Sequence, residues 1–359
     1  EGPRIEYRRT GAINEEWTEA RTNYRDYPSL IPGQYTFSLR VCDRNNNCSK
    51  EVVSFDFRIA KPWYKRLDVI FISVIVFAFS IFFAYRYRVR ILEEDRKKLA
   101  ELVKIQTRDL NDSINYAKRI QSAVLPNNET YFKKFPDSFI LFEPKDVVSG
   151  DFYWHSFTEN NLLIGAIDCT GHGVPGAFMS IIGTTLLNEI IHNEKIYQPA
   201  KILNALHSKI IQSLRQKENA TKDGMDVGFL RIDFNKMELD FSGALNDLYL
   251  VRDNSLSVVK GDYFPVGHDD FVDNVRFTNH KISIKKGDRI YINSDGYQDQ
   301  FGGNGVKDKK FLRKKYKNLL LSMSKMPMVE QEKYLRQVFN EWKGKVEQTD
   351  DILIIGIEI

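Results

Sequence analysis

Acidic residues stand at four separate places in the second half of the chain, each at the end of a predicted strand and beside a turn. Asp151 lies in VVSGDFYW, Asp168 closes the apolar run LLIGAI, Asp295 follows RIYINS, and Asp350 with Asp351 precedes ILIIGIEI. A single aspartate at such a place is usually a turn former or a helix cap. Four of them on strands whose ends converge would repel one another unless a cation lay between them.

These carboxylates predict a site for hard metal ions. The set offers oxygen ligands and no paired His or Cys, which favours Mg²⁺ or Mn²⁺. Two such ions bridged by a carboxylate would generate hydroxide from water at neutral pH and bind a phosphoryl oxygen. Gly150, Gly171, Gly173 and Gly296 would let the backbone approach the ions closely. The residues alone therefore predict a two-metal hydrolase acting on phosphate.

The elements that must position these residues begin after Asn128, where predicted strands alternate with amphipathic helices. Eight stretches between residues 115 and 359 resemble, in family order, the SpoIIE-type serine/threonine phosphatases of the metal-dependent protein phosphatase 2C superfamily. They are SINYAKRIQSAVLP, KDVVSGDFYW, AIDCTGHGVPGAFMS, KDGMDVGFLRID, FSGALNDLYLVR, FPVG, GDRIYINSDGYQDQFGG and EQTDDILIIGIEI. The resemblance implies an α+β fold whose catalytic domain, residues 127–359, is an αββα sandwich of two antiparallel sheets flanked by helices.

The resemblance also implies the ligand set for two Mn²⁺ or Mg²⁺ ions. Its carboxylates are Asp151, Asp168, Asp295 and Asp350, and Asp151, Asp168 and Asp295 would hold the metal-bound water that attacks phosphate. The family's backbone carbonyl ligand usually comes from a glycine, and here Cys169 occupies that position. A carbonyl ligand does not require glycine, and the thiol of Cys169 is expected to pack as a small apolar group.

Three further positions carry weaker expectations. Asp351 is the weaker candidate of its pair, because the family's ligand is the first aspartate. His172 lies four residues after Asp168, so the general-acid role of a histidine in eukaryotic members does not transfer, and we expect His172 to order its loop or contact phosphate. Asp226 is expected to face the metal ligands or to cap a strand. The phosphate-binding arginine of eukaryotic members has no counterpart that the sequence places.

A membrane span is predicted at residues 67–87. Between Asp68 and Arg86 lie 17 residues without a charge, which as a helix would span roughly 26 Å. A buried core helix is the alternative. Residues 86–104 contain seven Lys or Arg and residues 51–68 contain four. Because positive charges favour the cytoplasmic side, the sequence predicts a single pass through a bacterial inner membrane with the C-terminal side in the cytoplasm. Cys42 and Cys48 precede the span, where an oxidising compartment would permit a disulfide; two unpaired thiols are the alternative.

Residues 1–62 are predicted to be a small antiparallel β-sandwich outside the cytoplasm. The segments RIEYRR, QYTFSLRVC and EVVSFDFRI alternate apolar and polar residues. The spacing of their aromatic residues, Gly and Pro resembles the three-tyrosine (Y_Y_Y) module of bacterial membrane sensors. Because that module usually follows a β-propeller, and the chain begins at Glu1 without a methionine, we expect a longer precursor.

Residues 88–126 are predicted to form a signalling helix that Pro126 ends. A heptad repeat places Val103 and Leu110 at a, and Leu92, Leu99 and Ile120 at d. Polar residues interrupt this seam, so it suits a homodimer of modest stability; a solvated single helix is the alternative.

Composition excludes several classes of protein. With 42% hydrophobic residues the chain is not globally disordered, and a net charge of +4 is too small to indicate nucleic-acid binding. The resulting prediction is a membrane-anchored phosphatase for phosphoserine or phosphothreonine on a regulatory partner, which the resemblance identifies as a STAS-domain anti-sigma antagonist. The alternatives are a pseudophosphatase, or a histidine-kinase-like sensor, for which no phosphoacceptor or ATP-lid motif is found.

Overall fold

The structure of the chain is a computed structural model that describes residues 3–158, 160–216, 218, 222–268, 276–303 and 309–359. It divides into two compact units, Glu1–Val103 and Lys104–Ile359. The second unit contains all the predicted site residues.

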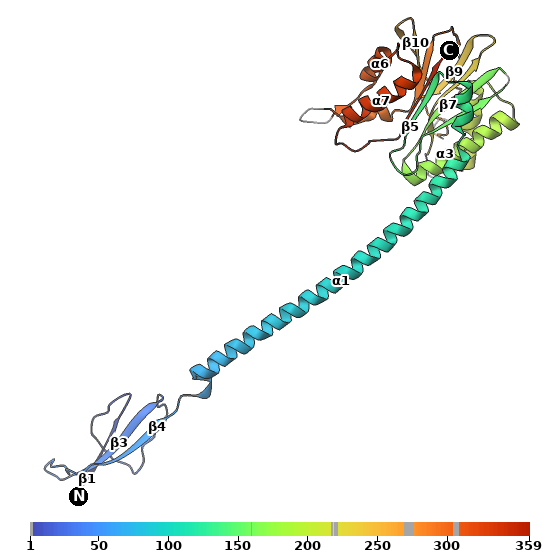
Figure 1. Cartoon of the computed structure of the whole chain (residues 1–359). Helices are drawn as coiled ribbons and strands as arrows, with labels where there is room; N and C mark the ends of the chain where they lie inside the picture. Colours follow the sequence, from blue (N-terminus) through green and yellow to red (C-terminus); the bar gives the residue numbers. More distant parts are fainter. Residues whose placement is uncertain (1–2, 159, 217, 219–221, 269–275, 304–308) are drawn as a thin grey trace. The chain divides into compact units, whose positions relative to one another are not determined.

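The first unit begins with a single antiparallel sheet in the order β2-β1-β3-β4 (Figure 1). Its strands are β1 (Arg4–Thr10), β2 (Thr18–Glu19), β3 (Gly33–Cys42) and β4 (Val53–Ile59). Among the described residues of this region there is no second sheet, so the prediction of a two-sheet sandwich is wrong. Residues 20–32 contain Pro28 and Pro32 and form no strand, and proline cannot donate to a strand ladder.

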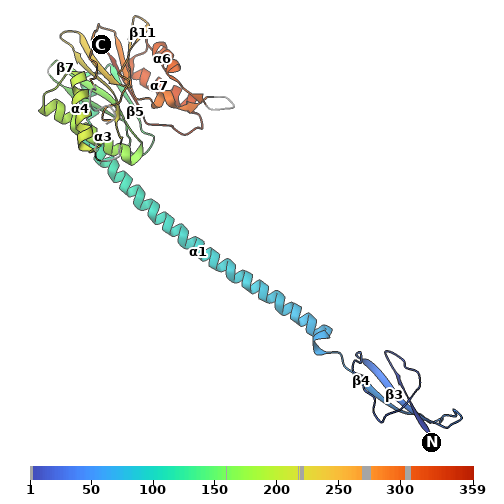
Figure 2. The ribbon, with the colours of Figure 1, turned by 180° about the vertical axis from the view of Figure 1, so that it is seen from behind.

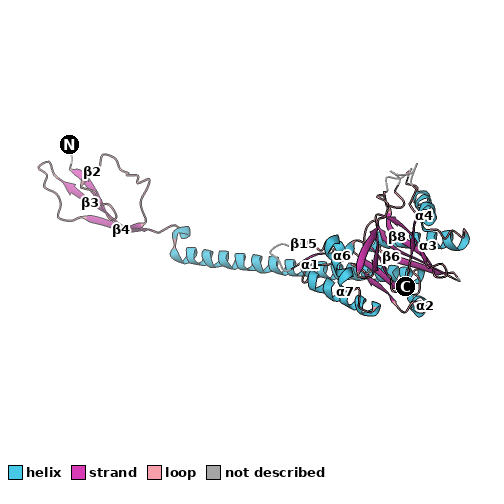
Figure 3. Cartoon of the chain, turned by 90° about the horizontal axis from the view of Figure 1, so that it is seen from above, coloured by secondary structure: helices cyan, strands magenta, loops and turns pink. Residues whose placement is uncertain are grey.

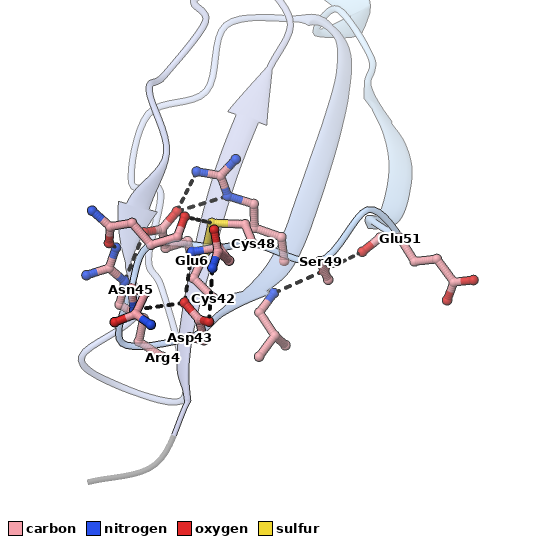
Figure 4. The surroundings of a disulfide bond; sticks show 12 residues. Arg4, Glu6, Cys42, Asp43, Asn45, Cys48, Ser49 and Glu51 are labelled. Carbon is pink, nitrogen blue, oxygen red and sulfur yellow. Dashed lines mark hydrogen bonds and ion pairs between the residues drawn. A yellow bond between two sulfur atoms is a disulfide. The ribbon is translucent and has the colours of Figure 1, made fainter.

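A disulfide closes the turn after β3. Cys42 and Cys48 are bonded, and the carboxylate of Asp43 accepts hydrogen bonds of 2.8 Å from the backbone nitrogens of Asn45 and Asn47 (Figure 4). An aspartate that bonds the backbone two residues ahead is a common turn former. The predicted pairing of the two cysteines is therefore present, and the carboxylate orders the polar loop between them.

One continuous helix, α1 (Leu67–Val124), follows the short turn η1 (Trp63–Lys65) and ends two residues before Pro126. Its most apolar window has a mean hydropathy of 2.6 and no buried residue. By length and composition a second helical stretch, Gly173–Asn193, could also cross a membrane, but 56% of its window is buried within the second unit. The exposed window of α1 coincides with the predicted span.

Two five-stranded antiparallel sheets form the second unit, in the orders β11-β10-β13-β16-β5 and β12-β9-β8-β7-β6 (Figure 3). The strands of the first are β5 (Ser138–Glu143), β10 (Leu248–Arg252), β11 (Ser255–Val259), β13 (Arg289–Asn293) and β16 (Ile352–Glu358). Those of the second are β6 (Phe152–Phe157), β7 (Asn161–Cys169), β8 (Met225–Asp233), β9 (Glu238–Ala244) and β12 (His280–Ser283). A small ribbon pairs β14 (Phe301–Gly302) with β15 (Lys309–Lys310).

Helices cover the outer faces of both sheets (Figure 2). The helices and helical turns of this unit are α2 (Asn128–Lys134), α3 (Gly173–Asn188), η2 (Glu189–Asn193), α4 (Pro199–Ser213), α5 (Gly296–Asp299), α6 (Arg313–Ser322) and α7 (Met328–Lys343). Leu187 of α3 and Leu203 of α4 pack on the β6–β9 sheet, and Leu320 of α6 packs on the other sheet.

Between the two sheets lies a shared core. Ile164 and Leu230 of one sheet contact the apolar cluster that contains Ile292 and Leu353 of the other. Side chains of a strand point alternately to the two faces of its sheet, so each central strand packs one set of side chains into this core and the other set against the helices. Both sets are apolar, which explains the nearly continuous apolar runs in the sequence. The predicted α+β fold with antiparallel sheets and flanking helices is confirmed.

Candidate metal centre

The two sheets bring aspartates together at one end of the sandwich. Asp168 is next to the last residue of β7, and Asp226 lies opposite it in the register of β8. Asp295 occupies the position before α5, after β13, and Asp350 lies two residues before β16. Because β7 and β8 belong to one sheet and β13 and β16 to the other, the cluster exists only when the sheets are packed face to face.

These side chains line a pocket of about 200 Å³. Its walls are Asp168, Cys169, Thr170, Gly171, His172, Asp226, Asp295 and Asp350. Asp151 does not line the open pocket: it is only 2% exposed, directly before β6, and interacts with the side chains of Ser294 and Asp168. Its Oδ2 atom is buried without a hydrogen-bond partner in the structure.

The pocket is short of positive charge. Burial raises the pKa of Asp151 and of Asp168 well above the ordinary value, and neighbouring carboxylates raise both further. Burial, followed by the charge of Asp295, raises the pKa of Asp226 to about 7. The pKa of Asp295 is also raised, first by burial and then by nearby carboxylates. Ionising all these groups together requires a cation among them.

The residues present fit hard divalent ions. The donors are carboxylate oxygens, and the buried Oδ2 of Asp151 is a polar atom that lacks a partner. Among the described residues, only Glu6, Cys42 and Cys48 bring three potential ligand atoms within 4.8 Å of one another, and the disulfide occupies both sulfurs. The described aspartate oxygens of the pocket therefore do not form a closed three-ligand group without an ion.

The adjacent aspartates of the TDD sequence have different surroundings. Asp350 faces the pocket, whereas Asp351 is 2% exposed. The carboxylate of Asp351 accepts hydrogen bonds of 2.7 Å from the backbone nitrogen of Lys145 and 2.8 Å from that of Gly150. Asp351 therefore fixes the chain that leads to Asp151, and Asp350 is the member of the pair that is available to an ion.

Cys169 ends β7 on the pocket wall and is only 4% exposed. Burial, and then the charge of Asp168, raises the pKa of its thiol well above the ordinary value. A raised pKa keeps the thiol protonated and unreactive. Its carbonyl oxygen lies 3.4 Å from where a Cβ on Gly150 would stand, and the carbonyl of Gly171 lies closer still. Gly150 is therefore required for this backbone approach.

His172 lies at the exposed rim, in a chain of polar contacts that the sequence did not predict. Its Nδ1 is 2.8 Å from Oδ2 of Asp146, and its Nε2 is 3.3 Å from Nζ of Lys145. Lys145 and Asp146 are the first two residues of the KDVVSGDFYW stretch, and their adjacent charges were the signal available in the sequence.

Gln121, in the last turn of α1, was also missed. It is 5% exposed, and its Nε2 donates to the carbonyl oxygen of Ser149 (2.6 Å) and to Oγ of Ser180 (2.8 Å). Its Oε1 accepts a 3.3 Å hydrogen bond from the backbone nitrogen of Ser149. The available signal in the sequence was its place in the SINYAKRIQSAVLP stretch that resembles the family.

Comparisons with known proteins agree with this arrangement. The model of the Stage II sporulation protein E (SpoIIE) family matches residues 158–359. The SiaA-PP2C domain of Pseudomonas aeruginosa is 30% identical, with a TM-score of 0.64 over 70% of this chain and 98% of that chain.

A more distant structure shares the fold alone. The PP2C phosphatase domain of SpoIIE from Bacillus subtilis, solved with a fragment of its regulatory domain, is 17% identical, with a TM-score of 0.51 over 62% of this chain and 63% of that one. No curated protein sequence matches the chain. The family match over residues 158–359 and the similarity to the SiaA domain lead to one conclusion: the chain belongs to the SpoIIE family of PP2C-type serine/threonine phosphatase domains.

Proposed function

We propose that this chain is a membrane-anchored, metal-dependent phosphatase that hydrolyses phosphoserine or phosphothreonine on a regulatory protein. The observation that carries the proposal is the meeting of Asp168, Asp226, Asp295 and Asp350, from both sheets, in one open pocket above the buried Asp151. Phosphatases of the PP2C type use Mn²⁺ or Mg²⁺, and the donor set of this pocket suits either ion.

Each group has a part in this proposal. Asp151, Asp168, Asp295, Asp350 and the carbonyl of Cys169 would hold two ions, which when bound polarise a water molecule and a phosphoryl oxygen. Asp226 would add negative charge behind them. The buried position of Asp151 keeps its carboxylate fixed, so the site is organised before substrate arrives.

The apolar half of α1 supports the membrane anchor, since its side chains are exposed to the surroundings rather than packed. The seam residues of its second half, Leu92, Leu99 and Leu110, are likewise exposed, which supports a homodimer through this helix. The resemblance to SpoIIE-type phosphatases supports a phosphorylated STAS-domain protein as substrate, with residues 88–359 in the cytoplasm.

Control by α1 is part of the proposal. Gln121 connects its last turn to Ser149, two residues before Asp151. A shift of the helix would therefore move the loop that carries a proposed ligand, which is how a small displacement is converted into a change at a distant site.

The test is phosphate release by residues 104–359, a range that retains Gln121. The protein is stripped of metal and supplied with Mn²⁺ or Mg²⁺, with an aryl phosphate and a phosphoserine protein as substrates. We expect metal-dependent turnover that Asp295→Asn abolishes. Asp253→Asn, a change at an exposed aspartate that does not line the pocket, should leave turnover intact.

A folded protein that turns over neither substrate with either ion would contradict the proposal for this range. Repeating the assay with the full chain then distinguishes the two remaining explanations. Turnover there would indicate an enzyme that depends on its N-terminal part, and continued absence with retained phosphoprotein binding would indicate a pseudophosphatase.

A further inference from the structure

We propose that the ammonium group of Lys145, oriented by His172 and Asp146, is the subsite that binds a phosphate oxygen of the substrate. The inference rests on the proposed function and adds to it a lysine at the rim of the pocket. The ligand class is a phosphate monoester dianion, or free phosphate as its product.

The three side chains form an ordered chain at the pocket rim. Oδ2 of Asp146 is 2.8 Å from Nδ1 of His172, and Nε2 of His172 is 3.3 Å from Nζ of Lys145. An ammonium group can only donate, so Nε2 accepts and Nδ1 donates to Asp146. Because His172 is itself part of the pocket wall, this chain holds the cation at the rim of the pocket that the aspartates line.

The backbone of Lys145 is fixed as firmly as its side chain. Its nitrogen donates to the buried carboxylate of Asp351, which neighbours the pocket-lining Asp350. On the other side, Gly173 has a φ of +67°, and a Cβ there would come within 3.2 Å of Oδ2 of Asp146. Glycine therefore lets Asp146 approach the start of α3, whose positive end lies on the same side.

The charge of Lys145 remains available to an anion. Among the described residues, Lys145 has no carboxylate within ion-pair distance, and its ammonium contacts a ring nitrogen instead. Two other cations act on the pocket carboxylates: Lys310 pairs with Asp299 at 2.6 Å, whereas Arg313 only reaches the 4.0 Å limit of an ion pair with Asp247.

Four aspartates line the pocket and repel a phosphate dianion, so a cationic donor at the rim favours its entry. A lysine serves this role as a mobile point charge, making charge-assisted hydrogen bonds to phosphate oxygens. Lys145 contacts the substrate in this scheme, and His172 and Asp146 are positioning residues.

The experiment compares the full chain in detergent micelles with Lys145→Met, Lys145→Arg and Asp146→Asn. The control is Lys314→Met, at an exposed lysine of α6. With Mn²⁺ present, steady-state kinetics on an aryl phosphate give kcat and KM, and inorganic phosphate is added as competitive inhibitor. Calorimetric titration with inorganic phosphate measures binding without turnover. Thermal unfolding checks that each variant is folded.

We expect Lys145→Met to raise both KM and the inhibition constant of phosphate by roughly tenfold to a hundredfold. The melting temperature should stay unchanged, since the backbone bond to Asp351 remains. Lys145→Arg should retain most of the affinity, Asp146→Asn should show a smaller loss of the same kind, and Lys314→Met should match the parent chain.

Unchanged phosphate affinity in folded Lys145→Met would overturn the inference, as would a parent chain that binds no phosphate. A parent chain that binds phosphate through Lys145 without turning over any substrate would contradict the proposed function and leave this subsite standing. The two failures are therefore distinguishable.

Discussion

The side-chain amide of Gln121 donates a 2.6 Å hydrogen bond to the carbonyl oxygen of Ser149. Gln121 belongs to the last turn of a 58-residue helix, and Ser149 lies two residues before Asp151. One buried side chain thus connects the end of α1 to the loop that carries a proposed metal ligand.

Replacing this side chain should weaken both the fold and the site. Gln121→Ala leaves the backbone nitrogen of Ser149 buried without its partner, which costs about 1–3 kcal/mol of unfolding free energy. We also expect a higher metal concentration for half-maximal activity, because the loop before Asp151 is released. Chemical denaturation and metal titration measure the two effects. Gln106→Ala, an exposed change on the same helix, is the control, and equal behaviour of the two variants would contradict the coupling.

Changing the helical phase of α1 tests control by the helix. Four residues inserted after Leu110 rotate everything that precedes them relative to Gln121, since a turn takes 3.6 residues. We expect altered phosphatase activity in the full chain and unaltered activity in residues 104–359 carrying the same insertion. If neither changes, α1 is only a tether.

The neighbours Asp350 and Asp351 should respond in opposite ways to the same substitution. Asp351→Asn replaces one carboxylate oxygen by an NH2 group, which then faces the backbone donor of either Lys145 or Gly150, and should cost about 1–3 kcal/mol of unfolding free energy without metal. Asp350→Asn removes charge from a crowded pocket, so metal-free stability should hold while stabilisation by Mn²⁺ is lost. Thermal unfolding with and without Mn²⁺ measures both effects. A loss of metal-free stability in Asp350→Asn together with a loss of Mn²⁺ stabilisation in Asp351→Asn would contradict these roles.

Asp226 should make the metal-free protein sensitive to pH. Its pKa is raised to about 7 from 3.8, mainly by burial, so the native state binds the proton more tightly than the unfolded chain does. Its contribution to the free energy of unfolding is complete below the pKa of the unfolded chain, 3.8, and is lost as pH rises through the native pKa of about 7. Urea unfolding of residues 104–359 in a chelator should therefore show a loss of stability between about pH 4 and pH 7 that Asp226→Asn reduces. Equal pH slopes in the two proteins would exclude this contribution.

The disulfide predicts a distinct pattern of cysteine labelling. Cys42 and Cys48 are bonded, and Cys169 is a buried free thiol. Alkylation of the denatured, unreduced chain should label Cys169 alone, as peptide masses would reveal. Reduction should destabilise the N-terminal sheet by about 2 kcal/mol, because the loop that the bond closes is short. Labelling of all three cysteines without reductant in protein from intact membranes would argue against an oxidising compartment for this region.

Much of the second unit could be predicted from the sequence, because strands buried on both faces and glycine-rich turns leave strong local patterns. The apolar runs around Ile164 and Ile292 predict strands, and the aspartates that follow them are predicted to lie at the strand ends. The N-terminal region was predicted less well: the alternation in β1 and β3 identified the strands, but nothing local indicates how many sheets they form. The described residues of this region form one sheet, and the proline-containing residues 20–32 form no strand.

The sequence by itself determined the kinds of ligand, since residue type sets donor chemistry, and it determined the apolar, uncharged stretch of α1, since composition sets hydropathy. Only the tertiary structure decided which groups share one pocket. The pairing of β7 with β8 brings Asp226 opposite Asp168. The face-to-face packing of the two sheets adds Asp295 and Asp350 to the same pocket, while Asp351 stays buried and Lys145 meets His172 at the rim. These relationships join residues far apart in the chain, and they depend on the long-range packing of the core, which no local pattern records.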